Sequence, residues 1–143
     1  MLKAESGKEV GPGRKLGTAR TFEDLLIFQE ARQLMKTVHA LTKSGPVLKD
    51  YPLRDQMHRS ALSIMSNIAE GFERGSNPDF VRFLFMAKGS CGELRAQAIA
   101  GADQDYWTRQ QFEQFANACR KLSGGISRLI TYLRRSPTNP NRG

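Results

Sequence analysis

Polar residues spaced three and four apart run through the stretch from Ser66 to Ser76, which reads SNIAEGFERGS. In a helix this spacing places Asn67, Glu70 and Arg74 on one face, beside the apolar residues that must build a core. Such a face fits a buried polar network, a subunit contact or an active site. In the last case Glu70 and Glu93 would be the candidate pair of carboxylates.

Structural partners close to both carboxylates favour a network over catalysis. A charged group brought inside a protein must be paired, because the cost of removing it from water is otherwise not met. We therefore predict that Asn67 and Glu70 belong to a buried polar network that links two neighbouring helices. The residues predicted to form it are Arg59, Ser63, Asn67, Glu70, Arg74, Ser90 and Glu93.

The two histidines argue against a metal centre and against nucleophilic catalysis. A carboxylate-bridged di-metal bundle needs two Glu-x-x-His pairs and two further acids, whereas this chain has only His39 and His58. Neither histidine lies near a turn that could shape a nucleophile, and no glycine loop has phosphate-cradle spacing. We expect no catalytic residue, no metal, no cofactor and no enzymatic activity.

A one-sided basic face is predicted for the last helical segment. Its cations project away from the apolar seam that runs from Phe112 to Leu133, and Glu113 is the acid among them. Such a face is often merely solvated, but it also fits binding of nucleic acid, more readily RNA. Tyr106, Trp107 and Tyr132 could stack on bases or plug the ends of the helices. The predicted nucleic-acid-binding residues are Arg109, Arg120, Lys121, Arg128 and Arg135.

Length and composition indicate a single domain with anionic partners. The chain has 143 residues and a formal charge of +8, with a pI near 9.9. Its two cysteines are too few for a disulfide scaffold, and no apolar run approaches a membrane span, so we expect a cytoplasmic protein. Residues 1–20 and 136–143 are poor in core-forming side chains and are predicted to be disordered tails, the first of them basic.

Four segments with helical periodicity fill residues 21–135. They start near Thr21, Pro52, Asn77 and Thr108, where capping residues or first-turn prolines stand. Apolar residues of the second and third segments pair in antiparallel order, from Leu53 with Ala98 to Phe72 with Phe80. This pattern predicts an all-α, up-down-up-down antiparallel four-helix bundle. In this register Cys91 and Cys119 share one layer as free thiols.

Some small and apolar residues are left unexplained by the bundle. The mid-helix residues Gly89, Ser90, Gly92, Gly124 and Gly125 fit either close helix packing or entry of another subunit. Leftover apolar residues favour self-association, because exposed apolar surface often marks an interface. These residues are Leu26, Val81, Phe85 and Ile130.

Two specific sequence elements are Asn67-Ile68-Ala69-Glu70-Gly71 and the motif formed by Gly89-Ser90 with Glu93. They occur together with Asp24-Leu25, Phe28-Gln29, Ala31, Leu53, Gln56, Arg59, Ser63, Arg74, Phe80, Leu84, Ala87 and Leu94. In these residues the chain from about Phe22 to Leu133 resembles the four-helix-bundle proteins encoded in intervening sequences of bacterial 23S ribosomal RNA genes. Pro52 departs from the glycine usual there, as Gly92 does from the bulkier residues common after Cys91.

This resemblance implies a small bundle that associates into rings, often homopentamers. It also implies a relation to the basic accessory protein of diversity-generating retroelements, which contacts nucleic acid and a reverse transcriptase. The family carries no catalytic residues. We therefore expect a non-enzymatic oligomeric accessory protein that binds nucleic acid. The alternative is an oligomeric protein–protein adaptor that is basic for solubility.

Overall fold

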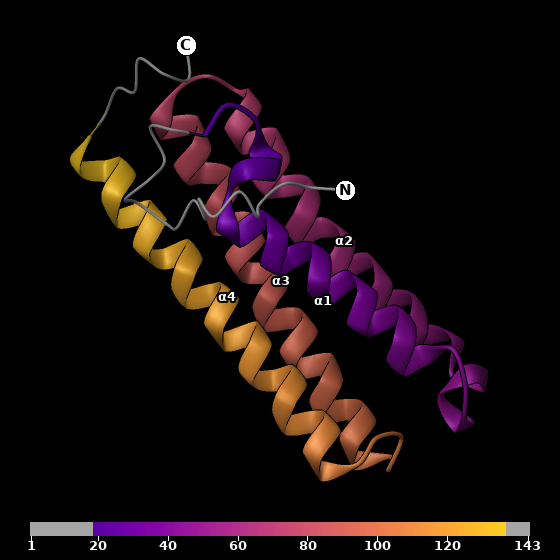
Figure 1. Ribbon diagram of the computed structural model, residues 1–143. Coiled ribbons are helices and arrows are strands. Elements are labelled where there is room, and N and C mark those ends of the chain that lie inside the picture. The colour runs from indigo at the N-terminus through magenta and orange to yellow at the C-terminus, as the bar shows by residue number, and fades with distance from the viewer. Residues whose placement is uncertain (1–18, 137–143) are drawn as a thin grey trace.

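The computed structural model describes residues 19–136, which form one elongated bundle of four long helices (Figure 1). The predicted tails, 1–20 and 136–143, lie almost entirely outside the described residues. The long helices are α1 (Leu26–Thr42), α2 (Tyr51–Glu73), α3 (Asn77–Asp103) and α4 (Arg109–Arg135). Two short 3-10 turns, η2 (Phe22–Asp24) and η3 (Pro46–Lys49), flank α1.

The first helix begins later than the sequence suggests. Thr21 caps the short turn η2, whose Asp24 side chain accepts hydrogen bonds from the backbone N–H groups of Arg20 and Thr21. Leu25 then adopts an extended conformation, so α1 starts at Leu26 and not near Thr21. The capping signal at Thr21 is real, but it serves η2.

Caps also fix the start of the other three helices. Asp50 caps α2, and Thr108 forms the predicted capping box with Gln111 at the start of α4. For α3 the cap is Ser76, whose hydroxyl accepts from the N–H of Asp79, and not Asn77 as predicted. Asn77 is instead buried and donates to the backbone carbonyl of Ser136.

The predicted all-α four-helix fold is confirmed, because each helix packs against its sequence neighbour and α1 also packs against α4. The rings of Phe72 and Phe80 meet edge to face at 5.9 Å between centroids, as the predicted antiparallel register requires. Fully buried side chains such as Met57, Ile64 and Leu94 fill the core along the bundle axis. No helix in residues 19–136 is long and apolar enough to cross a membrane.

At the α3–α4 turn, Trp107 closes the end of the bundle. Its indole is buried, and Nε1 donates to the backbone carbonyl of Ala98 at 3.0 Å. The ring lies directly over Gly101, where a Cβ atom would come within 2.0 Å of it. Trp107 was predicted either to stack on bases or to plug the ends of the helices, and its burial fits the second role.

Candidate nucleic-acid interface

The outer face of α4 presents the five predicted cations to solvent. The buried residues of this helix, among them Phe115, Cys119 and Leu129, form a stripe that packs on the core. At about 100° per residue, the five basic positions fall within an arc of about 120° on the opposite side. All of them are exposed: Arg109, Arg120, Lys121, Arg128 and Arg135.

Local partners hold three of these cations in place. The Nε of Arg109 lies 3.1 Å from Glu113, and Arg120 donates to the Asn117 side chain at 2.8 Å. Lys121 lies 3.6 Å from Glu30 of α1. Within the sequence of α4, Glu113 is the acid among these cations. Glu30 is a second acid beside this face, contributed by a neighbouring helix.

Two cations from α3 that were not predicted from the sequence line the same hollow as Arg120. Lys88 and Arg95 line a hollow of about 230 Å³ between α3 and α4, together with Arg120 and Ser123. A signal for them exists in the sequence, since positions 88, 92 and 95 follow helical spacing. The basic surface therefore extends from α4 across the groove onto α3.

The floor of this hollow holds the two cysteines. Cys91 and Cys119 are buried free thiols that both line the hollow, which confirms that they share a layer. Burial raises the pKa of each thiol to about 12, while the positive charges of Lys88 near Cys91, and of Arg95 and Arg120 near Cys119, act in the lowering direction. The thiols therefore stay protonated at neutral pH and are poor nucleophiles.

The predicted polar network exists in part, between α2 and α3. The hydroxyls of Ser63 and Ser90 lie 2.9 Å apart, and the Asn67 amide donates to the Ser63 hydroxyl at 3.0 Å and to its backbone carbonyl at 2.9 Å. Ser90 is buried, and the other two side chains are half-buried. This group links the two helices as the spacing suggested.

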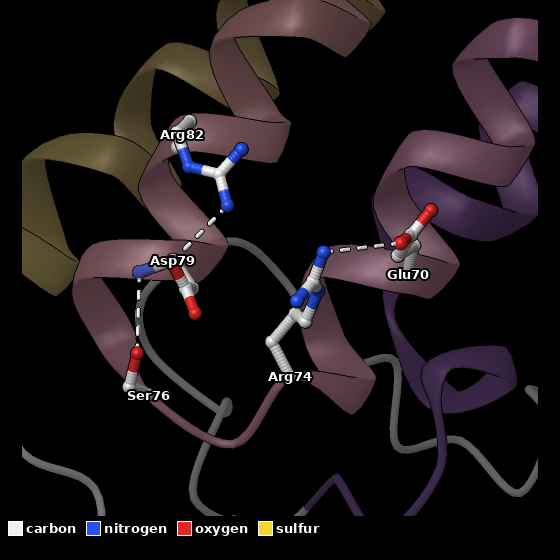
Figure 2. Close-up of polar contacts among 5 residues, drawn as sticks. All are labelled: Glu70, Arg74, Ser76, Asp79 and Arg82. Carbon is white, nitrogen blue, oxygen red and sulfur yellow. Dashed lines mark hydrogen bonds and ion pairs between the residues drawn. The ribbon is translucent and has the colours of Figure 1, made fainter.

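The expectation of burial is wrong for the charged members. Glu70 and Arg74 form an ion pair of 3.4 Å whose side chains are 56% and 44% exposed (Figure 2). Glu70 comes two residues after the fully buried Ile68, which at about 100° per residue places it about 160° around the helix from that core position. Arg74 instead stacks on the Phe83 ring, with Arg82 beside it.

Arg59 and Glu93 do not join this network. Both side chains are exposed, and within residues 19–136 neither one bonds to Ser63, Asn67 or Ser90. The two candidate carboxylates, Glu70 and Glu93, are thus both on the surface.

The two histidines meet between α1 and α2, with ring centroids 4.4 Å apart. Nε2 of His58 lies 3.0 Å from the Thr42 hydroxyl. Burial lowers the pKa of His58, and the positive charges of His39 and Arg54 lower it further, against a smaller raising effect from Asp55. In the described part of the chain no group of three or more potential metal ligands occurs.

The model of the 23S rRNA-intervening sequence protein family matches residues 23–128. Among solved structures, the chain is similar to a protein of unknown function from the S23 ribosomal protein family of Bacteroides thetaiotaomicron VPI-5482. That likeness has a TM-score of 0.64 at 21% identity, and it covers 73% of this chain and 91% of the other. At this sequence identity, the likeness is evidence for a shared fold alone. No curated protein matches the chain in sequence.

Proposed function

This chain belongs to the 23S rRNA-intervening sequence protein family, and we propose that it is a non-enzymatic accessory protein that binds nucleic acid, preferentially RNA, through the outer face of α4. The observation that carries the proposal is the clustering of cations on one side of the bundle. Lys88 and Arg95 of α3 add to the five basic residues of α4 on that side. Charge gathered on one face is the usual footprint of a phosphate-binding surface.

The chemistry of this face suits contact with a phosphate backbone more than reading of bases. Arginine donates paired N–H groups to phosphate oxygens, and four of the five predicted contacts of α4 are arginines. Trp107 is buried and Tyr106 is bonded to Asp50, which leaves them unsuited to stacking on bases. Binding is therefore expected to tolerate many sequences and to depend on charge.

Self-association would strengthen such binding. Phe85 is 46% exposed and Val81 is half-buried, so apolar surface on α3 is available for contact with a second copy of the chain. Ile130, which was predicted as a further interface residue, is instead buried in the core. In a homopentameric ring the basic face would recur in every subunit, and weak contacts would add through effective concentration. Ring formation and a relation to the accessory protein of diversity-generating retroelements stay predictions.

The test is retardation of a generic RNA by the purified protein at several salt concentrations. If one subunit neutralises five phosphates of a single strand, log affinity should fall with log salt at a slope of about −3.5, since each phosphate contributes about 0.7. That slope corresponds to roughly a 100-fold loss of affinity between 50 and 200 mM salt.

Charge reversal at Arg120, Lys121 and Arg128 should abolish binding while helicity and oligomeric state stay unchanged. The matched control carries Lys36→Glu, Lys43→Glu and Lys49→Glu, three exposed lysines on α1 and on the segment from α1 to α2. Both variants change the net charge equally. If the α4 variant loses RNA binding and the control variant keeps it, binding is assigned to the α4 face. Wild-type protein that fails to retard RNA or DNA at low salt would favour the protein–protein adaptor.

A further inference from the structure

The hollow between α3 and α4 gathers three cations around one space. Lys88 and Arg95 of α3 line it together with Arg120 of α4, and Ser123 adds a neutral hydroxyl donor. Arg120 bonds to the neutral Asn117, and none of the three cations has a carboxylate within 4.0 Å among residues 19–136. Like charges that converge without a counter-ion repel each other, so an anion placed between them would be stabilised.

The hollow is wide enough for such an anion because Gly92 has no side chain. A Cβ atom at Gly92 would meet nothing within 4 Å, so the glycine is not required by close packing of the described helices. The volume of about 230 Å³ is far above the roughly 10–15 Å³ that holds one water. Close helix packing, one of the two explanations given for the mid-helix glycines, therefore does not apply to Gly92.

The electrostatics of the floor agree with this arrangement. The positive charge of Lys88 acts on the Cys91 thiol, and those of Arg95 and Arg120 act on the Cys119 thiol, in each case in the direction that lowers the pKa of the thiol. All three cations therefore lie close enough to the hollow for their charge to act on the residues that line it. Because burial keeps both thiols neutral, they do not supply the missing negative charge.

We propose that this hollow is a phosphate-binding site, in which Lys88, Arg95 and Arg120 surround the phosphate oxygens and Ser123 donates a hydrogen bond. A tetrahedral phosphate offers acceptors in several directions and so matches donors that converge from two helices. The phosphate can belong to a nucleic-acid strand or to a free phosphoanion. In the first case the inference rests on the proposed function, with the hollow seating one phosphate of the bound strand.

The test blocks the hollow without changing charge. Gly92→Gln fills it with a neutral side chain, and Gly89→Gln is the matched control, because Gly89 also has open space around its Cα and does not line the hollow. Inorganic phosphate is titrated into each protein at constant ionic strength, set with chloride, while the amide signals of residue 92 and Ser123 are followed by NMR. Circular dichroism checks that both variants remain helical.

The site is supported if the Ser123 amide signal shifts saturably with phosphate in the wild type and in Gly89→Gln. The phosphate affinity obtained from these shifts should be at least tenfold weaker in Gly92→Gln. If phosphate also displaces RNA, the strand is the source. If phosphate binds but the wild type does not retard RNA, the proposed function fails and the site stands for free phosphoanions. If RNA binds but phosphate produces no saturable shift, or binds Gly92→Gln equally well, the site is overturned and the proposed function stands.

Discussion

Replacement of Gly101 by alanine should destabilise the bundle, against the usual preference of helices for alanine. The new methyl group would lie 2.0 Å from one ring carbon of Trp107 and 2.6 Å from another, far inside contact distance. The indole cannot stay in place, because these atoms belong to the rigid ring and not to a flexible tip. Trp107 would therefore lose its packing and its hydrogen bond to Ala98.

The size of the effect follows from three contributions. Overpacking a filled site costs roughly 2 kcal/mol, and a lost hydrogen bond costs about 1 kcal/mol. The better helix propensity of alanine returns about 1 kcal/mol. The expected net loss is about 2 kcal/mol of unfolding free energy, or about 8 °C in melting temperature for a folded region of this size.

Gly89→Ala is the internal control for this reasoning. Gly89 is also in the middle of α3, but a Cβ atom there meets nothing within 4 Å. Alanine should then stabilise the protein by up to about 1 kcal/mol through helix propensity. Thermal melts followed by circular dichroism at one protein concentration measure both variants. A Gly101→Ala protein that melts at or above the wild-type temperature would refute the role assigned to Trp107.

Three further predictions concern the polar link between α2 and α3, the two cysteines and His58. Ser63→Ala should lower the free energy of unfolding, measured by chemical denaturation, by about 1 kcal/mol, because the hydrogen bond to the buried Ser90 hydroxyl is lost. Glu70→Ala should lower it by at most about 0.5 kcal/mol, since the ion pair of Glu70 is exposed. Cys91 and Cys119 should resist a thiol reagent at pH 8 in the folded protein and react after unfolding, because burial raises their pKa values to about 12. His58 should titrate by NMR below its ordinary pKa of 6.5. Because the unfolded chain then binds the proton more tightly than the folded protein, the free energy of unfolding should be highest above pH 6.5 and fall as the pH drops below that value. His58→Gln should reduce this pH dependence.

The fold could be predicted from the sequence because its signals are local and agree with one another. A first-turn proline, Pro52, marks the start of α2, and the capping box of Thr108 marks the start of α4. The apolar spacing fixes the register that brings Phe72 to Phe80. The errors occur where two local signals compete. Thr21 caps a 3-10 turn instead of the helix, and Ser76 takes the cap position assigned to its neighbour Asn77.

The candidate site was less predictable because it depends on which helices lie side by side. Periodicity on α4 alone places its five cations on one face, but it gives no information on the contribution of α3. Lys88 and Arg95 become neighbours of Arg120 through tertiary packing. For Glu70, the spacing of three and four grouped it with Asn67 and Arg74, but its position about 160° around α2 from the buried Ile68 keeps its carboxylate in solvent.

The packing order of the helices places the polar link of α2 on a different side of the bundle from the basic face of α4. The helices follow one another around the bundle, with α1 also packed on α4, so α2 lies diagonally opposite α4. The Ser63 and Asn67 side chains and the Glu70–Arg74 ion pair therefore occupy the α2–α3 side, away from the outer face of α4. The apolar patch of Val81 and Phe85 lies on the α3–α4 side, where Arg134 stacks on the Phe85 ring and lines a hollow together with Val81. Arg120, Lys121 and Arg128 lie at least six residues before Arg134 on α4, which is about 9 Å along the helix axis. If subunits associate through Val81 and Phe85, charge reversal at these three positions should therefore remove nucleic-acid binding and leave the oligomeric state unchanged.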